Sequence, residues 1–381
     1  MTGKRLVLHG EFVEAYLYFD FLWLFAADGS IRAFDIAAFC ATRLNGDGAA
    51  ATALFSDNRL LETGTEEQIS EAARLLKNGG EYDVSGIEVD RFSYIFEHEL
   101  EFRSLLDVKF YYGRAYVGTD ASVVQLRAMS QGDMDHARGS MSKGGLNRQK
   151  LSDLPARVIQ CRFGAVSAAC GPDGGLIGFG ADAETADWRL SLKQFAERSY
   201  GVAINGHVVT NLASRTKVQI YGATLEPGRA SRTANGEEFG EERRQRLTAI
   251  SAAPLKEPST RVNTLAETDG GGSLFLFNKT VWQFDARGHS RRASLIGENL
   301  DIGQIQMTPL REGPPGRVLA MSSMWAGVIA ETDDAVFVMR GGGWTPLVEE
   351  PVHSVRGYQN SKRYQRVATA VMEDRVEIIA I

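Results

Sequence analysis

Seven segments of the chain repeat one pattern: an apolar run, a short turn, and a second run in which apolar and polar residues alternate. Alternation with a period of two places successive side chains on opposite faces of a strand, so each segment predicts an antiparallel hairpin. The turns contain Asp, Asn or Gly, which tolerate the backbone angles of tight turns. The predicted hairpins span residues 21–36, 114–128, 165–181, 207–223, 273–286, 326–340 and 365–381.

The surroundings of these hairpins predict a repeated four-stranded unit. Around the sixth hairpin, the runs at 317–322 and 344–348 add one strand before it and one after it. Four strands in about 35 residues are the size of one blade of a β-propeller. We therefore expect an all-β fold, a β-propeller of seven blades, in which residues 1–381 form a single domain.

Two of the hairpins carry a more specific feature. The segments FAADGSIRAFD and LFNKTVWQFDA contain Phe34-Asp35 and Phe284-Asp285 near their ends. In this they resemble the middle strands of WD-repeat and related propeller blades, where the second strand often ends in Trp or Phe followed by Asp. The other five hairpins lack this ending, and no Gly-His pair opens the repeats. The resemblance implies the propeller architecture and indicates no particular family within it.

The two ends of the chain predict how the propeller closes. The seventh hairpin ends at Ile381, so no residues follow it to form an outer strand. An unpaired apolar edge is prone to pair with other chains. Lys4–Leu8 is a short β-prone run before the first hairpin. We expect it to pair with Arg375–Ile381, which would complete one blade from the two chain ends and close the ring.

A helical insertion, at about residues 37–82, is expected between blades 1 and 2. Thr65 is a typical helix cap, acidic residues follow it and Gly79 ends the run, which together predict a helix. A second helix is expected over 186–199. Two long loops, at about 130–156 and 226–245, are expected to carry the contact with a partner. Such loops are uncommon in compact domains unless they are functional or disordered.

Charge and cysteine content narrow the class of protein. The formal net charge is -6 and the pI is about 5.7, which disfavours nucleic acid as a partner and gives no general attraction to an acidic membrane. The apolar run at 15–27 is interrupted by Asp20 and is shorter than a membrane span. Cys40, Cys161 and Cys170 lie in separate segments without a CxxC spacing, which is typical of free thiols in a reducing compartment. We expect a cytoplasmic protein that does not bind a membrane.

Acidic residues recur in the predicted turns. Asp28, Asp120, Asp173 and Asp333 lie in the turns of four hairpins, and Asp374 lies in that of a fifth. Equivalent hairpins of a propeller point the same way, so these carboxylates are expected on one rim, where they would attract a cation or a basic partner. However, an Asp in a tight turn accepts hydrogen bonds from its own backbone, and this alone accounts for such residues.

Among the tryptophans, Trp325 is the one we most expect to reach a face of the molecule, because it directly precedes the strand that begins near Gly327. The others are assigned to packing between blades. The candidate binding residues are therefore Asp28, Asp120, Asp173, Asp333 and Trp325.

The sequence contains none of the common catalytic signatures: no HExxH, GxSxG, Walker loop or GxGxxG. The six histidines lie in six different segments. Asp133, Asp135 and His136 resemble a metal-ligand cluster in residue type, but a Gly/Ser-rich loop surrounds them, which favours a solvated segment. The Arg-rich stretch at 229–246 is interleaved with Glu and favours self-pairing. We assign no catalytic residue, no metal ligand and no cofactor.

Two functions remain open at this point. The first is a non-catalytic interaction or ligand-sensing module, a scaffold for a protein partner, with a small ligand as the other class of binding partner. The alternative is a propeller enzyme, a metal-assisted hydrolase or lactonase, with carboxylates and a histidine at the central channel. The lack of a catalytic motif favours the first.

Overall fold

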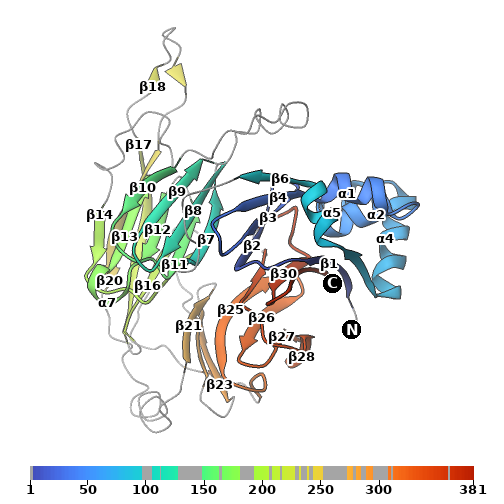
Figure 1. The fold of residues 1–381 in the computed structure, drawn as a ribbon. Coiled ribbons are helices and arrows are strands. Elements are labelled where there is room, and N and C mark those ends of the chain that lie inside the picture. The colour runs from blue at the N-terminus through green and yellow to red at the C-terminus, as the bar shows by residue number, and fades with distance from the viewer. Residues whose placement is uncertain are drawn as a thin grey trace. The chain divides into compact units, whose positions relative to one another are not determined.

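The computed structural model describes most of the chain (Figure 1). The described residues are 3–96, 105–111, 113–127, 148–162, 165–180, 193–205, 208–214, 217–227, 231–232, 238–239, 243–251, 273–277, 280–284, 289–294, 308–309, 312–358 and 361–381. They form two compact units. Unit 1 holds the described residues up to 96 and those from 312 onward, and unit 2 holds those from 105 to 309.

Unit 1 is built on three antiparallel sheets, one of which gains a parallel edge strand. The N-terminal sheet has the order β2 (Glu14–Tyr18), β3 (Phe21–Phe25), β4 (Ile31–Asp35) and β6 (Ser93–Phe96). The β25–β28 sheet contains β25 (Val318–Met324), β26 (Gly327–Thr332), β27 (Val336–Arg340) and β28 (Gly343–Val348). The terminal sheet has the order β29 (Ser354–Gly357), β30 (Val367–Val371), β31 (Arg375–Ala380), β1 (Lys4–His9) and β5 (Glu81–Val84).

Unit 2 contains four four-stranded sheets and one small hairpin among its described residues. Each sheet takes four strands in chain order, as a propeller blade does. The sheets contain β7 (Leu105–Tyr111), β8 (Arg114–Thr119), β9 (Val123–Arg127) and β10 (Arg148–Ser152); β11 (Val158–Arg162), β12 (Ala165–Ala169), β13 (Leu176–Gly180) and β14 (Lys193–Ala196); β15 (Gly201–Asn205), β16 (Val208–Ser214), β17 (Lys217–Pro227) and β20 (Arg243–Ser251); and β21 (Ser273–Phe277), β22 (Thr280–Phe284), β23 (Ser290–Ser294) and β24 (Thr308–Pro309). The hairpin pairs β18 (Ser231–Arg232) with β19 (Glu238–Phe239), and a short helix, α7 (Gly171–Gly174), joins β12 to β13.

All seven predicted hairpins are confirmed as antiparallel pairs. In six sheets the pair consists of the second and third strands: β3–β4, β8–β9, β12–β13, β16–β17, β26–β27 and β30–β31. In the remaining sheet the pair β21–β22 consists of the first and second strands. The flanking strands predicted around the sixth hairpin are confirmed as β25 and β28. The number of blades is not confirmed, because the sheets belong to two units, and it stays a prediction.

The predicted pairing of the chain ends is confirmed. Strand β1 pairs antiparallel with β31, in a register that runs from Lys4 opposite Ala380 to His9 opposite Arg375. Figure 1 accordingly shows the N and C labels close together beside β1. Leu6 and Leu8 on β1, and Val376 and Ile378 on β31, are completely buried. Outside the core, Arg5 and Arg375 both bind the Glu377 carboxylate, and Arg5 also donates to the Leu347 carbonyl at 2.6 Å.

The helical insertion is confirmed as helical, but its predicted position is wrong. Its helices are α1 (Ile36–Arg43), α2 (Gly48–Phe55), α3 (Leu60–Thr63), α4 (Glu66–Asn78) and α5 (Gly86–Arg91). They lie between β4 and β6, the third and fourth strands of one sheet, and therefore not between two blades. Within the insertion, β5 leaves the helices and pairs parallel with β1, which extends the terminal sheet. Thr65 caps α4 as expected, in a capping box with Gln68.

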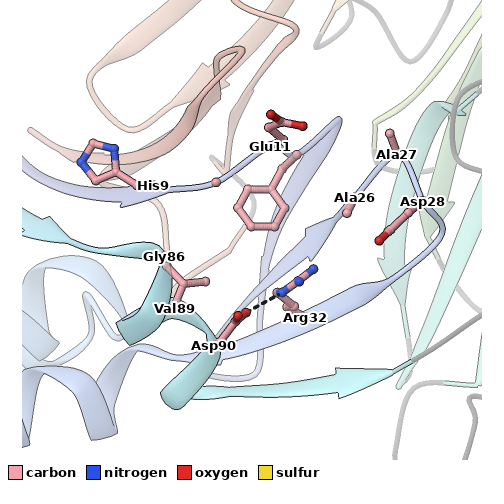
Figure 2. A pocket seen from close by; sticks show the side chains of 11 residues that line it. His9, Glu11, Ala26, Ala27, Asp28, Arg32, Gly86, Val89 and Asp90 are labelled. Atoms are coloured by element: carbon pink, nitrogen blue, oxygen red, sulfur yellow. Dashed lines mark hydrogen bonds and ion pairs between the residues drawn. The ribbon is translucent and has the colours of Figure 1, made fainter.

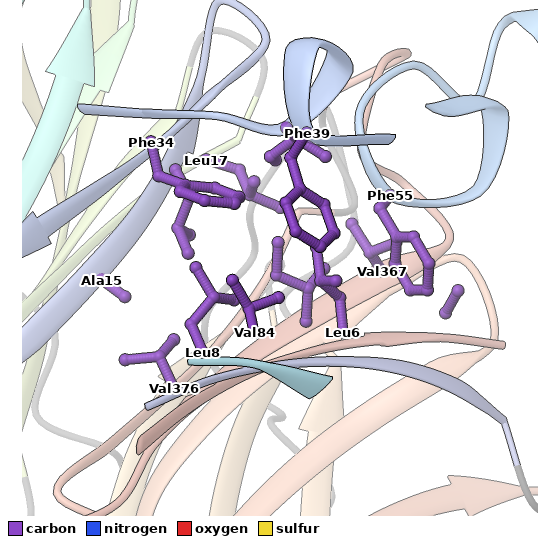
Figure 3. Packing of buried hydrophobic residues seen from close by; sticks show 14 of the residues in the cluster. Leu6, Leu8, Ala15, Leu17, Phe34, Phe39, Phe55, Val84, Val367 and Val376 are labelled. Carbon is purple, nitrogen blue, oxygen red and sulfur yellow. The ribbon is translucent and has the colours of Figure 1, made fainter. Parts of the chain in front are cut away.

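The helices of the insertion pack against both the terminal sheet (β29–β30–β31–β1–β5) and the N-terminal sheet (β2–β3–β4–β6). Phe39 of α1 and Phe55 of α2 pack over Leu6 and Leu8 of β1 in one buried cluster (Figure 3). Buried Asn58 fixes the insertion to the loop between β29 and β30. Its Nδ2 donates to the Ala53 and Leu54 carbonyls at 3.0 and 2.8 Å, and its Oδ1 accepts from the backbone N–H of Arg366 at 2.9 Å.

Three predictions about connecting segments need correction. In place of the predicted helix over 186–199, Lys193–Ala196 forms the strand β14, because these residues pair with β13 at the edge of its sheet. The predicted loop at 130–156 contains β10 from residue 148 onward, and residues 130–147 lie outside the described part. Both ends of the predicted loop at 226–245 lie in strands, because its first residues end β17 and its last residues begin β20, with Pro227 opposite Arg243. None of the helices in the described part of the chain has both the length and the apolar content needed to span a membrane.

Candidate functional site

The predicted acidic residues occupy equivalent places in five sheets. Each lies in the connection between the second and third strands: Asp28 after β3, Asp120 after β8, Asp173 in α7 after β12, Asp333 after β26 and Asp374 after β30. All five are exposed. Asp28, Asp333 and Asp374 belong to unit 1, and Asp120 and Asp173 belong to unit 2.

Hydrogen bonds to backbone N–H groups account for two of these carboxylates, within the turn for Asp28 and from outside the turn for Asp333. The Asp28 Oδ1 accepts from the backbone N–H of Ser30 at 2.8 Å, and the Asp333 Oδ1 accepts from that of Arg317 at 3.1 Å. The bond from Ser30 lowers the pKa of Asp28, because it favours the charged carboxylate. In the turns of Asp120 and Asp333 a threonine, not the predicted Asp, makes the local bonds. The hydroxyls of Thr119 and Thr332 accept from the backbone N–H groups of Ser122 and Ala335 at 2.9 and 3.1 Å.

Asp28 also lines a pocket in unit 1. The pocket has a volume of about 520 Å³ and lies where the connection from β1 to β2 meets the β3–β4 turn and α5 (Figure 2). The apolar part of its wall comes from Phe12, Ala26, Ala27 and Val89, and the charged part comes from His9, Glu11, Asp28, Arg32 and Asp90. Phe12 is buried, so the connecting segment is held in place by its aromatic side chain.

The two basic side chains of the pocket are already paired. Arg32 donates from Nε to Asp90 Oδ1 at 2.9 Å and from Nη1 to Ser30 Oγ at 2.8 Å. The Nε2 of His9 lies 2.6 Å from Asp83 Oδ1. Figure 2 shows Glu11 and Asp28 beside the same hollow, and no basic side chain among the described residues pairs with either of them. The pocket therefore carries an excess of negative charge.

An exposed apolar side chain lies next to this pocket. Ile87 is 83% exposed on α5, between the pocket residues Gly86 and Val89. Single exposed aliphatic side chains are common on protein surfaces, so Ile87 adds apolar area beside the pocket but does not by itself mark a contact region.

Sequence reasoning identified only Asp28 in this pocket. Glu11, Arg32 and Asp90 come from three separate segments: the β1–β2 connection, β4 and α5. They meet because the insertion that begins after β4 ends with α5, which lies beside β4. The one signal in the sequence is the alternation IRAFD in β4, which places Arg32 on a face opposite to Ile31 and Ala33.

Trp325 lies at the other end of its sheet from Asp333. It occupies the turn between β25 and β26, whereas Asp333 follows the last residue of β26. Trp325 is 60% exposed, as predicted for a residue that reaches a face. Its backbone N–H donates to the Gln365 carbonyl at 2.6 Å, and the guanidinium carbon of Arg366 lies 4.4 Å from the centre of its ring.

A second charged cluster of unit 1 is buried. Arg356 on β29 donates to both carboxylate oxygens of Glu14 on β2, at 3.1 and 2.5 Å, and the Ser354 hydroxyl donates to the same group at 2.9 Å. Glu331 on β26 is also buried near this pair. Burial raises the pKa of Glu331 to about 7, and the nearby charge of Glu14 acts in the same direction.

The remaining candidates for chemistry bring together no site. In the part of the chain that the structure describes, no three His, Cys, Asp or Glu side chains are grouped so that they could hold a metal ion. Asp133, Asp135 and His136 lie outside that part. The three cysteines are free thiols, and burial raises the pKa of Cys40 and of Cys170 to about 12.

Comparisons with known proteins identify the fold. No family model matches the sequence, and no curated protein matches it. Among solved structures, the N-terminal domain of Nup159 superposes with a TM-score of 0.50 at 7% identity, over 98% of this chain and 90% of that one. The Cps50 (Swd1) β-propeller domain of Myceliophteria thermophila superposes with a TM-score of 0.49 at 9% identity, over 99% of both chains. A chain of the Mitotic Checkpoint Complex has a TM-score of 0.48 at 8% identity, over 99% of this chain and 87% of that one. The chain has the all-β β-propeller fold that its repeats predict.

Proposed function

We propose that this chain is a β-propeller interaction module that binds a basic segment of a protein partner in the pocket lined by Glu11, Asp28 and Asp90. The seven sheets of four or five strands would be the seven blades of one ring. That ring would act as a scaffold and present the pocket at the connections between strands. Loops and strand connections on a rigid scaffold are where propellers and similar folds carry binding residues.

The observation that carries this proposal is the charge of the pocket. Arg32 and His9 are each paired with an aspartate, Asp90 and Asp83 respectively. Glu11 and Asp28 are exposed, and neither forms an ion pair among the described residues, although the charge of Arg32 acts on Asp28. With Asp90 they outnumber Arg32, so they would attract a lysine or arginine side chain. The apolar wall of the pocket and exposed Ile87 would pack against the stem of that side chain or against an apolar neighbour of it.

The test replaces charge without changing the local fold. In an Asp28→Asn variant, the side-chain oxygen still accepts from Ser30, so the turn is kept while the charge is lost. Combined with Glu11→Gln, this change should weaken binding of a fluorescein-labelled peptide of alternating Arg and Leu about tenfold in fluorescence anisotropy.

Asp333→Asn is the matched control, because Asp333 also lies in a turn and accepts from a backbone N–H through Oδ1, but it lies outside the pocket. It should bind the peptide like the wild type. Equal binding by the double variant, or an equal loss in the control, would contradict the proposal. The blade count is tested separately: an experimental structure with a number of blades other than seven would show that the sheets do not form the proposed ring.

A further inference from the structure

The β25–β26 turn presents an exposed tryptophan in a fixed position. Its backbone is bonded to Gln365, and Arg366 covers one face of the indole. Arg366 is itself fixed through its backbone N–H to buried Asn58. Strand β29 also packs closely against the end of β25, which helps to fix the turn that carries Trp325. A Cβ on Gly357 would lie 2.1 Å from the Ser323 carbonyl oxygen, and the Gly357 N–H donates to Ser322 Oγ at 2.6 Å. The Trp–Arg pair is therefore held before any partner arrives, so binding costs little ordering.

The loop that carries Arg366 is basic. Residues 357–366 contain Lys362, Arg363 and Arg366 and no carboxylate. Arg363 is compensated, because its Nη1 donates to Asp20 Oδ1 at 2.6 Å. Neither Lys362 nor Arg366 pairs with a carboxylate within the described residues, and the Arg366 Nε–H has no acceptor there. Within the described part, two positive charges of this loop thus remain without an ion pair, and that of Arg366 lies against the exposed ring.

We infer that Trp325, Lys362 and Arg366 form a second binding surface, which takes an acidic segment of a protein partner that carries an aromatic or aliphatic side chain. The carboxylates of such a segment would pair with Arg366 and Lys362, and its apolar side chain would pack on the free part of the indole. Trp and Arg are the residue types that most often dominate protein interfaces. The surface is opposite in charge to the pocket, and it lies at the end of β26 away from Asp333, so it would bind a different segment.

The test uses a fluorescein-labelled peptide of alternating Glu and Phe residues, titrated with the full chain and followed by fluorescence anisotropy. The wild type should bind it, more weakly as salt is added. Trp325→Ala and Arg366→Gln should each weaken binding about tenfold, as expected for a residue at the centre of an interface. Trp325→Phe should restore most of the affinity, because it keeps an aromatic face.

The matched controls are Lys77→Glu and Tyr200→Ala. Lys77 is an exposed cation on α4, and Tyr200 is an aromatic side chain that is 42% exposed in unit 2. Both should bind the peptide like the wild type. The inference is overturned if the wild type does not bind the peptide, or if Trp325→Ala binds it unchanged. It is also overturned if a single-stranded oligothymidine or vesicles with anionic lipid bind through Trp325 while the peptide does not. The variants Glu11→Gln and Asp28→Asn should leave this binding unchanged, which separates the two surfaces.

Discussion

At the scale of single residues, the buried carboxylates of Glu14 and Glu331 differ in how they are compensated. Glu14 accepts hydrogen bonds from two nitrogens of the Arg356 guanidinium and from the Ser354 hydroxyl, and these bonds offset the cost of burying its charge. Among the described residues, no arginine makes a pair of hydrogen bonds of this kind to Glu331, and burial raises its pKa to about 7 from its ordinary value of 4.5. Near neutral pH the folded protein therefore carries a carboxylate in an environment that disfavours its charge.

This difference predicts a dependence of stability on pH. Since the pKa of Glu331 is higher in the folded than in the unfolded chain, the folded chain binds more protons between pH 4.5 and 7. Its contribution to stability is present below pH 4.5 and is lost as the pH rises toward 7. Glu331→Gln removes this loss, so the variant should gain on the order of 1–3 kcal/mol over the wild type between pH 5 and pH 8.

Chemical denaturation at these two pH values measures the difference. The control is Asp334→Asn, which neutralises an exposed carboxylate three residues away. It should show no such gain. A gain by Glu331→Gln that is equal at both pH values would contradict the assignment, because it would reflect packing and not ionisation.

At the scale of elements, the sequence pattern predicts the middle strands better than the outer ones. The seven hairpins could be predicted because an apolar run and a run of alternating polarity are joined by a short turn. The outer strand β6 follows five helices and is only four residues long, so the position of the insertion inside a sheet could not be predicted. Likewise, Lys193–Ala196 has no strong strand signal, and pairing with β13 overrides its local preference.

The pairing of β1 with β31 predicts a large effect of single core residues near the N-terminus. Leu8 is completely buried between the terminal sheet and the helices. Leu8→Ala should therefore lower the free energy of unfolding by about 2–5 kcal/mol, because it leaves a cavity in this core. Removal of residues 1–9 should be worse and should destabilise the protein cooperatively or cause aggregation through the exposed edge of β31.

Urea denaturation compares these variants with Ile87→Ala. Ile87 is 83% exposed, so its truncation should change stability by no more than about 0.5 kcal/mol. If the chain without residues 1–9 unfolds at the same urea concentration as the full chain, the strand pairing does not stabilise the fold.

At the scale of the whole molecule, the two proposed surfaces explain why the site could be predicted only in part. Asp28 was found because turn chemistry marks it, and Trp325 because an aromatic residue before a strand start is conspicuous. Glu11 lies in the same pocket as Asp28, and Arg366 lies against the ring of Trp325. Both come from other segments of the chain, which the fold brings together. Sequence spacing carries no record of such neighbours.

The closeness of the chain ends gives a prediction for the molecule as a whole. Lys4 pairs with Ala380, so a short Gly/Ser linker could join the ends without distorting β1 or β31. Joining them covalently restricts the unfolded chain, and the chain-entropy model gives a stabilisation of about 4–6 kcal/mol for a loop of this length. The circular protein should unfold at a higher temperature than the linear chain that carries the same linker. Equal melting temperatures in calorimetry would show that the ends separate before the rest of the protein unfolds.

The shared terminal sheet also determines when the protein can fold as it leaves the ribosome. Unit 1 needs both β1 and β31, and every other described strand lies between them in the sequence. Leu6 and Leu8 therefore have no complete core to enter until β31 has been synthesised. Unit 2 is drawn from the middle of the chain, so its sheets can form while the ribosome is still adding residues 312–381. Strand β1 therefore stays without its partner strand while the residues between the two are synthesised, and exposed apolar strands of this kind are prone to aggregate.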